Sequence, residues 1–550
     1  MRDIWGIVLV AAVTVVGIAG AAVYFRRRSQ RRIARILLEQ WGAKPERAAS
    51  EDELLGIRVN AAALMDFDVD DITWNDLEMD RVYREANNAQ TTAGDHMLYA
   101  LLRRPCLTEG DLLRRQAILD WAAQDEAGRE RIKRRLYRLG RVRNIDIRQM
   151  LEKQWYDARM LPLCIGLSAA LAVSIALGAA GLRAAWAVAG ILAFANSLLA
   201  LRSRKKIGVY MAVVGYIPRL IGAAGRIIGE STPALDALRA RLIPLYERVR
   251  GIAGSWIAAS YTGVIVWEDF TSFLRLAFLI DAISYHRLTR AVWAHREELR
   301  GIYMLVGELD ALIAAASWRQ ALPQWCRPEM GGSGIAFEGM VHPLLPGAVP
   351  NSADLQGNLL LTGSNASGKS TFLKAVALNA LLAQALGTAT AQRWRGGFFR
   401  VYTSMALRDN LFQGESYFIA EIRSLKRLLD AREGQPPCLC IIDEVLRGTN
   451  TGERIAAAAQ VLTEMGQGPG LCLAATHDGE LTGLLGPAYR NCHFTETIVD
   501  GDVRFDYRLR QGPAASRNAI ALLGIMGFDQ QLVEQARERL QRFEQTGVWS

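Results

Sequence analysis

A glycine-rich loop between a strand-like run and a helix-like run constrains the fold of this 550-residue chain more than any other segment. The apolar run 358–362 precedes the loop. The loop comprises Gly363, Ser364, Asn365, Ala366, Ser367, Gly368, Lys369, Ser370 and Thr371. This order lets backbone N–H groups close around the β- and γ-phosphates, with Lys369 as a point charge and Ser370 as a hydroxyl ligand for Mg²⁺. The sequence therefore predicts an α/β domain that binds a nucleoside triphosphate.

Two further apolar runs end in polar residues that suit phosphate chemistry. The run 438–442 has the continuous apolar character of a buried parallel strand and ends in Asp443 and Glu444. We expect Asp443 to hold Mg²⁺, directly or through water, and Glu444 to orient or deprotonate the attacking water. The run 470–475 leads to His477, which would sense the γ-phosphate or position water. Without a P-loop, an ordinary polar loop would be the better interpretation of these residues.

Three long apolar runs predict a membrane protein. Residues 4–25 carry no charge and are too long for the apolar part of a signal peptide, so we expect a retained anchor. The runs 161–182 and 184–201 predict a membrane hairpin whose two ends lie on the cytoplasmic side. Basic residues flank these runs: Arg26, Arg27, Arg28, Arg31, Arg32, Arg202, Arg204, Lys205 and Lys206. A buried core hairpin, rich in Ala and Gly, is the alternative for the second and third runs.

The charge of the chain does not require a nucleic acid. The five basic residues after the first run and the four after the hairpin together equal the formal net charge of +9, so membrane orientation accounts for the excess. The basic segment 129–148 is read as a solvated face near anionic lipid, with nucleic-acid contact as the alternative. Seven scattered cysteines without a C-x-x-C pair indicate reduced, buried thiols.

These markers divide the chain into five parts. We expect a transmembrane anchor at 1–27, a cytosolic helical region at 28–158, a transmembrane hairpin at 159–203, a second helical region at 204–325 and the nucleotide domain at 326–550. The stretch 210–228 is apolar enough for another span, but Pro218, Arg219 and Arg226 favour a core or interfacial helix. The predicted location is a bacterial-type inner membrane, with the nucleotide domain in the cytoplasm.

Several ordered motifs over about 200 residues give the nucleotide domain a resemblance to the MutS mismatch-repair family, an ABC-type ATPase. They are His342-Pro343, Val349-Pro350-Asn351, the P-loop, residues 409 and 414–421, Asp443-Glu444 with residues 447–451, Thr476-His477, and residues 507–527. Residues 74–78, 104–105 and 114–116 resemble the start of the family's helical core, and residues 309–312 resemble the end of its lever helix. The chain thus looks like an α/β P-loop (ABC-type) ATPase domain joined to an all-α, MutS-core-like region with transmembrane helices.

The sequence departs from the family in ways that limit what carries over. It shows no N-terminal mismatch-reading domain and no Phe-x-Glu wedge. The usual Pro, Met and Gly of the P-loop are here Ser364, Ala366 and Ser367. Ala348 and Val349 stand where the family often stacks an aromatic ring on adenine. We therefore expect a membrane-attached relative of MutS rather than a mismatch-repair protein proper.

The resemblance implies a Mg²⁺-dependent ATPase that works as a homodimer. Val349 and Asn351 would bind nucleotide, and Ser416 of a second subunit would reach the γ-phosphate; a simple helix cap is the alternative role of Ser416. ATP binding would move the helical lever, and DNA is a possible partner. The alternative function is a conformational switch that acts on a membrane or protein partner without DNA. A transporter is a weaker alternative, because the apolar runs carry no ionisable residue.

Overall fold

The protein was analysed as a computed structural model, which describes residues 2–45, 49–142, 146–147, 159–260, 268–364, 367–405, 417–446, 449–499, 502–514 and 519–547. It divides into two compact units. The helical unit comprises Met1–Asp66, Glu85–Ala100 and Ala117–Ala321, and the α/β unit comprises Phe67–Arg84, Leu101–Gln116 and Leu322–Ser550. This division differs from the predicted one, because two short N-terminal segments group with the C-terminal domain.

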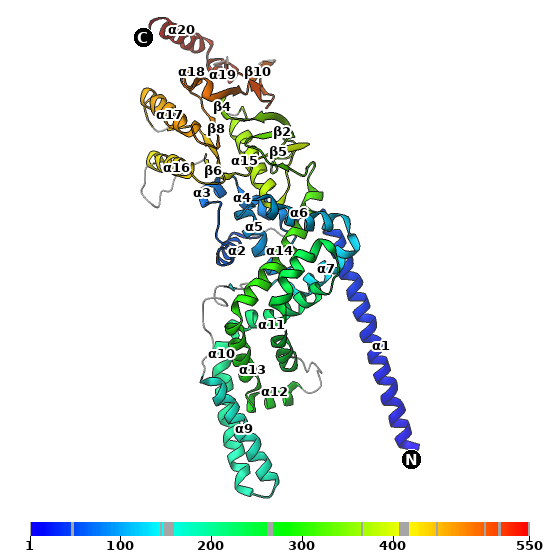
Figure 1. Ribbon diagram of the computed structural model, residues 1–550. Helices are drawn as coiled ribbons and strands as arrows, with labels where there is room; N and C mark the ends of the chain where they lie inside the picture. Colours follow the sequence, from blue (N-terminus) through cyan, green and yellow to red (C-terminus); the bar gives the residue numbers. More distant parts are fainter. Residues whose placement is uncertain are drawn as a thin grey trace. The chain divides into compact units, whose positions relative to one another are not determined.

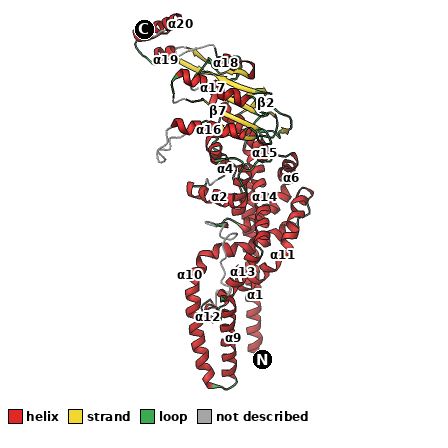
Figure 2. Ribbon diagram, turned by 60° about the vertical axis from the view of Figure 1, so that its left-hand side comes forward, coloured by secondary structure: helices red, strands yellow, loops and turns green. Residues whose placement is uncertain are grey.

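The helical unit is built from helices alone within the described residues (Figures 1 and 2). They are α1 (Arg2–Glu39), α2 (Glu51–Leu64), α5 (Thr92–Arg103), α6 (Glu109–Gln124), α7 (Glu126–Leu139), α9 (Met160–Ala179), α10 (Arg183–Ile228), the 3₁₀ turn η1 (Pro233–Leu235), α11 (Asp236–Ser260), α12 (Glu268–Ala277), α13 (Ile280–Ala294) and α14 (Arg296–Ala321). Helices α5 and α6, like α4 (Met79–Ala86) of the other unit, contribute residues to both units.

The predicted hairpin forms, and it is α9 followed by the first part of α10. Met160–Ala179 and Arg183–Arg202 are the two described helical stretches that are long and apolar enough to cross a membrane. Only 11% and 22% of their apolar windows are buried within the chain, whereas a core hairpin would be mostly buried. Burial therefore does not account for their apolar surface. The passage of the hairpin through a membrane stays a prediction, as does that of residues 4–25, which form part of the single helix α1.

Helix α10 continues without interruption to Ile228, with Pro218 inside it, so the boundary predicted between residues 203 and 204 falls within a helix. Tyr216, Ile217 and Leu220 in its second half are buried. The stretch 210–228 thus includes part of the helical core, in line with the interpretation based on its proline and arginines.

The basic segment on α7 is only partly the solvated face that we expected, because Arg131 and Arg138 are exposed but two of its basic residues are not. Arg129 and Lys133 are buried, and the Arg129 guanidinium lies 3.8 Å from the ring of Trp41. Lys133 Nζ donates to the carbonyl of Leu37 in the last turn of α1, at 3.1 Å. Their aliphatic stems are removed from water while an aromatic ring or a carbonyl receives the charged ends. The prediction is wrong for these two residues, and they are not available to a nucleic acid.

The α/β unit carries the sheets (Figure 1). Its elements are α3 (Asp71–Asp76), α4 (Met79–Ala86), β1 (Glu329–Met330), β2 (Ile335–Met340), β3 (Asn351–Leu355), β4 (Asn358–Thr362), α15 (Lys369–Leu386), β5 (Arg393–Gly396), β6 (Arg400–Ser404), α16 (Tyr417–Ala431), β7 (Cys438–Asp443), α17 (Thr451–Gly466), β8 (Leu471–Ala475), α18 (Leu481–Leu484), η3 (Gly486–Ala488), β9 (Tyr489–His493), β10 (Glu496–Val499), β11 (Asp502–Phe505), β12 (Arg510–Gln511), α19 (Ala519–Ile525) and α20 (Gln530–Thr546).

A six-stranded sheet positions the predicted site. Its strand order is β12-β9-β4-β8-β7-β6, and every pairing is parallel except that of β12 with β9. The three predicted strands are β4, β7 and β8; β7 and β8 are buried throughout, and β4 is buried from its second residue. They lie side by side, with Ala475 opposite both Leu361 and Asp443. The carboxyl ends of the three strands therefore meet at one edge, where α/β sheets bind ligands.

The N-terminal helix α3 covers the β6 edge of this sheet. The backbone N–H of Thr403 donates to Thr73 Oγ1 at 3.2 Å. Asp76 Oδ2 accepts from Thr403 Oγ1 at 2.7 Å and from the N–H of Met405 at 3.0 Å. An uncovered strand edge would leave such groups available to another chain. Segment 67–84 thus completes the fold of the domain that holds the P-loop.

Candidate nucleotide site

The P-loop joins β4 to α15, in the strand, loop and helix order that the sequence predicts. Gly363 has φ 139°, and a Cβ there would lie 2.7 Å from the carbonyl oxygen of Phe494. Gly368 has φ 105°, so both positions require glycine. Lys369 is buried, and its Nζ donates to the carbonyls of Gly363 at 2.7 Å and Ser364 at 2.8 Å. The loop folds around its own lysine. Asn365 and Ala366 lie outside the described residues.

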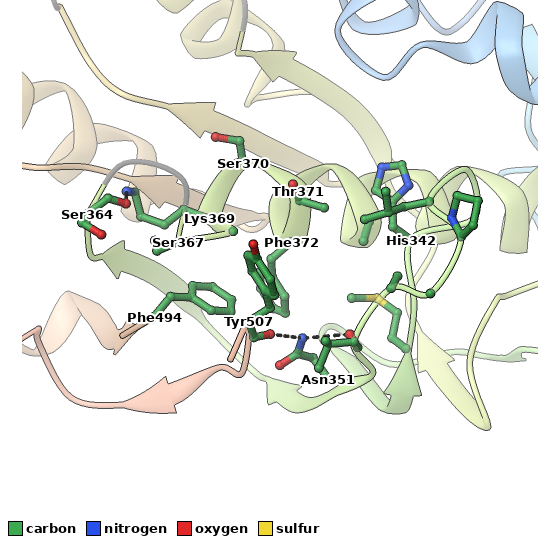
Figure 3. Close-up of a pocket in the computed structure, with 18 of the residues that line it drawn as sticks. His342, Asn351, Ser364, Ser367, Lys369, Ser370, Thr371, Phe372, Phe494 and Tyr507 are labelled. Carbon is green, nitrogen blue, oxygen red and sulfur yellow. Dashed lines mark hydrogen bonds between the residues drawn. The ribbon is translucent and has the colours of Figure 1, made fainter. Parts of the chain in front are cut away.

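A cavity of about 500 Å³ opens beside this loop (Figure 3). It is lined by Met340, His342, Leu345, Pro346, Gly347, Ala348, Val349, Asn351, Ser364, Ser367, Gly368, Lys369, Ser370, Thr371, Phe372, Ala375, Glu444, Phe494 and Tyr507. The predicted nucleotide-binding residues Val349 and Asn351 therefore line the same cavity as most of the P-loop and Glu444. Its size is in the range of small-molecule sites.

The two predicted catalytic residues are in contact. Glu444 Oε1 and His477 Nε2 lie 2.8 Å apart, although 33 positions of sequence separate the residues. Glu444 has φ 61°, and its N–H donates to the carbonyl of Ala475 at 2.9 Å, which fixes it just past the end of β7. Leu446 also has a positive φ, 58°, and its N–H donates to Glu421. Positive φ at non-glycine residues costs about 1–3 kcal/mol each and is concentrated at functional sites.

The predicted metal ligands supply oxygen atoms. Asp443 is buried at the end of β7, and Ser370 lines the cavity from the first turn of α15. Among the described residues, no group of three or more His, Cys, Asp or Glu side chains could hold a metal ion. Mg²⁺ at nucleotide sites typically uses one or two carboxylates together with phosphate oxygens and water. A hydroxyl and a carboxylate fit that ion, so the residues present are suited to Mg²⁺ bound with a nucleotide.

A histidine and a lysine connect the cavity to segment 67–84. Burial, with the charge of Lys374 as a smaller cause, lowers the pKa of His342 from 6.5 to about 4, so this cavity-lining imidazole is neutral at pH 7. Lys374 lies on α15 and donates to Glu78 Oε1 at 3.1 Å. A hydrogen bond from Arg81 is the largest cause of the lowered pKa of Glu78. Burial raises this pKa, and Lys374 lowers it further. The helix that carries the P-loop is thereby tied to an N-terminal segment.

The place of Tyr507 in the cavity lining was not predicted from the sequence. Tyr507 faces the cavity from the loop after β11, stacked on Phe505 with ring centres 5.9 Å apart (Figure 3). Asn351 Nδ2 donates to the carbonyl of Tyr507 at 3.0 Å, and the N–H of Leu509 donates to Asn351 Oδ1 at 2.8 Å. Asn351 thus holds the Tyr507 loop in place. No local pattern could have found this, because the ring reaches the cavity through contacts 156 positions apart.

A second missed contact involves the P-loop itself. Ser364 Oγ donates to Glu496 Oε2 at 2.8 Å, and Glu496 is a buried residue at the start of β10. The contact is formed by residues 132 positions apart in the chain. The β10–β11 hairpin therefore contributes both Glu496, which holds the loop, and the connection to Tyr507.

Some predicted residues cannot be placed. Ser416 lies outside the described residues, as do Arg447, Gly448 and Ser516 of the quoted motifs. The contact of Ser416 with a second subunit's nucleotide therefore stays a prediction. Gly363, Asp443 and His477 are described but are not part of the cavity lining.

Comparison with known proteins agrees with this geometry. Residues 359–544 match the family described as MutS domain V. The chain is 34% identical over 275 residues to the DNA mismatch repair protein MutS of Natronomonas pharaonis. This match covers 47% of this chain and 32% of that protein. It is 33% identical over 256 residues to the DNA mismatch repair protein MutS 2 of Halobacterium salinarum, with 44% and 29% covered.

A third relative matches a larger share of this chain. The DNA mismatch repair protein MutS of Chloroflexus aurantiacus is 29% identical over 366 residues, which covers 62% of this chain and 36% of that protein. The chain thus spans about a third of the length of these relatives. The region of residues 359–544 is therefore similar to MutS domain V, and the relatives that this chain resembles are named MutS or MutS 2.

Proposed function

We propose that this chain is a membrane-attached, MutS-type ATPase that binds Mg·ATP in the cavity beside the P-loop and hydrolyses it. The observation that carries the proposal is the convergence of Lys369, Ser370 and Glu444 on one cavity of about 500 Å³. Their strands and helix are in the P-loop order, and Glu444 is held by His477.

Each side chain has a defined task in this proposal. Lys369, whose Nζ bonds two loop carbonyls, would exchange them for phosphate oxygens when ATP enters. Ser370 and Asp443 would hold Mg²⁺, which neutralises charge on the phosphates when bound. Glu444 would accept a proton from, or orient, the attacking water, and His477 would fix its carboxylate.

A second copy of the chain would complete the site. Ser416 of that copy would add a donor to the γ-phosphate. Three exposed apolar residues support this proposal: Met526 and Phe528 between α19 and α20, and Leu532 on α20. Exposed apolar side chains close together in the chain suit an interface between subunits. The chain would then act as a homodimer.

ATP-driven closure would be passed on to the membrane. Helix α14 contains residues 309–312 and ends at Ala321, one residue before the α/β unit resumes at Leu322. This covalent continuity supports its role as a lever. The exposed apolar surface of α9 and the first part of α10 supports their insertion in a bilayer, with the ATPase domain in the cytoplasm.

ATP binding and hydrolysis by the detergent-solubilised, full-length chain test the ATPase. Lys369→Ala should abolish ATP binding, because it removes the cation from the phosphate loop. Lys426→Ala is the matched control, since Lys426 is exposed and pairs only on the surface with Asp430. Unchanged ATP binding by Lys369→Ala, measured by equilibrium binding of labelled ATP, would contradict the proposal.

DNA binding is the second candidate function, and the similarity to DNA mismatch repair proteins favours it. A switch that acts on a membrane or protein partner is the alternative. The measurements that separate them are the salt dependence of binding to duplex and branched DNA and the ATPase rate with and without those DNAs. A steep salt dependence with stimulated ATPase activity supports DNA, whereas no binding and no stimulation support the switch.

A further inference from the structure

The break between α12 and α13 packs against the middle of the α9–α10 hairpin. Helix α12 ends at Ala277, and α13 begins at Ile280 (Figures 1 and 2). Ala277 lies in one buried cluster with Leu171 of α9 and Ala189 of α10. Leu279 and Ala282 lie in a second buried cluster, together with Cys164 and Ala200 of the hairpin. Each cluster joins residues of the predicted hairpin, 159–203, to residues of the predicted second helical region, 204–325.

Polar side chains of the hairpin satisfy the backbone at this break. Asn196 is fully buried on α10, and its Nδ2 donates to the carbonyl of Ala277 at 2.8 Å. Ser168 Oγ of α9 lies 2.7 Å from the carbonyl of Phe278. Carbonyls in the last turn of a helix lack partners within that helix. The hairpin supplies partners for two of them, next to Leu279, which has φ 50°.

The contacts lie deep along the hairpin. At a rise of 1.5 Å per residue, Leu171 is about 16 Å along α9 from Met160, and Asn196 is about 9 Å along α10 from Arg202. The hydrocarbon core of a bilayer is about 30 Å thick. If the hairpin crosses this core, Ala277 lies well inside it. Leu279, which clusters with Cys164 about 6 Å along α9 from Met160, lies nearer the edge of the core.

We propose that α12 and the first turns of α13 form a re-entrant element that enters the bilayer beside the hairpin. The inference rests on the proposed membrane attachment of the hairpin. Helix α12 has 10 residues and is therefore about 15 Å long, which is too short to span the hydrocarbon core of a bilayer. Phe273 of α12 and Ile280 at the start of α13 are exposed. Lipid chains are the partner that their apolar surface fits.

Two further features suit this environment. Non-helical backbone is tolerated at membrane depth only where protein buries it and satisfies it, as Asn196 and Ser168 do here. The charged residues that flank the break, Arg275 and Asp281, form an ion pair with Nε and Nη2 at 2.9 and 2.6 Å from Oδ1. Ionisable residues within a membrane pair with one another in this way.

Thiol labelling of the full-length chain tests the proposal. Phe273→Cys is treated with a membrane-impermeant maleimide in open membrane fragments, where both faces meet the reagent. Leu55→Cys on α2, also an exposed apolar position, is the water-accessible control, and Phe194→Cys in the hairpin is the embedded reference. The parent chain gives the background, because six of its cysteines are buried and Cys326 is partly buried. We expect loss of labelling at Phe273→Cys and Phe194→Cys and full labelling at Leu55→Cys.

The outcomes separate the two proposals. If Phe273→Cys labels as fully as Leu55→Cys while Phe194→Cys stays protected, the re-entrant element is refuted and the hairpin remains embedded. If Phe194→Cys also labels fully, membrane insertion of the hairpin fails as well. Ile280→Cys provides a second position on the other side of the break should Phe273→Cys not accumulate. Labelling of Phe273→Cys should increase when Asn196→Ala is added, because the substitution releases the carbonyl of Ala277.

Discussion

The two units bury polar side chains in different ways. In the α/β unit, Lys369 is buried and lines a cavity that can admit a ligand. In the helical unit, His96 and Asp310 are buried among helices, and neither lines that cavity. Burial is therefore not what marks a functional polar residue here. The presence of a cavity beside the residue is the distinguishing feature.

Asp310 and His96 of the helical unit have hydrogen-bond partners within that unit. Asp310 of α14 accepts hydrogen bonds from the N–H groups of Gln90 and Thr91 and from Thr91 Oγ1, and so caps the start of α5. Burial raises the pKa of Asp310 to about 6, although these hydrogen bonds act in the opposite sense. The hydroxyl of Tyr303 lies 2.9 Å from His96 Nδ1. These contacts hold α5 against α14, and we assign them to stability.

The largest effect should come from Glu444→Gln in the α/β unit. The substitution keeps the shape of the side chain but removes its basicity, so we expect ATP to bind and turnover to fall by about 10³- to 10⁴-fold. Single-turnover hydrolysis together with retention of labelled ATP measures both quantities. Glu433→Gln, at an exposed position, is the control. Normal hydrolysis by Glu444→Gln would remove this residue from the catalytic role.

The next effect should come from His96 in the helical unit and should appear only on acidification. Burial lowers the pKa of His96 from 6.5 to about 3, so the folded state binds fewer protons than the unfolded state between these pH values. The stability that neutral His96 provides is present above pH 6.5 and is lost as the pH falls toward 3. At 1.36 kcal/mol per pKa unit, the loss is about 3 to 5 kcal/mol.

The variant His96→Asn tests this assignment, because its amide oxygen can accept from Tyr303 but does not titrate in this range. Thermal midpoints of the parent and of the variant, recorded from pH 7 to pH 4, should converge as the pH falls, while ATPase activity at pH 7 stays unchanged. His295→Asn, at an exposed position, serves as control. Parallel pH profiles for parent and His96→Asn would show that His96 is not the source of acid sensitivity.

The sequence predicted the α/β site well where the signal was local. The P-loop, the strand before Asp443 and the strand before His477 each carry their pattern within about ten residues, and the parallel sheet then brings their ends together. The resemblance of residues 74–78 to the start of the family's helical core did not indicate that this segment covers the edge of the sheet.

What could not be predicted depends on contacts between distant residues. Arg129 and Lys133 look like a solvated basic face because nothing nearby in sequence reveals that Trp41 and Leu37 pack over them. The same holds for Tyr507, whose place in the cavity depends on Asn351. Ala277 at the break and its partner Asn196 likewise lie 81 positions apart, and neither carries a motif.

Asp76 offers a way to sharpen the comparison, because it is a buried polar residue of the α/β unit that does not line the cavity. Asp76→Ala leaves the hydroxyl of Thr403 and the N–H of Met405 without their acceptor, which should lower the free energy of unfolding by about 1 to 3 kcal/mol. Calorimetry measures the loss, and the KM for ATP should stay unchanged. Asp430→Ala, at an exposed ion pair, is the control. A raised KM with unchanged stability would show that proximity to the cavity is not the deciding feature.

The smallest effect should come from Tyr507, which is half-exposed and yet lines the cavity, the reverse of His96. Aromatic stacking contributes about 0.5 to 1.5 kcal/mol beyond the area that it buries, so Tyr507→Ala should weaken ATP binding by roughly tenfold. Tyr507→Phe keeps the ring and should bind ATP like the parent, and neither variant should change the thermal midpoint by much. Equal affinity for ATP and for ribose triphosphate in the parent would mean that no ring contacts the base. If instead Tyr507→Ala loses the preference for ATP and Tyr507→Phe keeps it, the exposed Tyr507, which lines the cavity, has more influence on ligand binding than the fully buried His96, which does not line it.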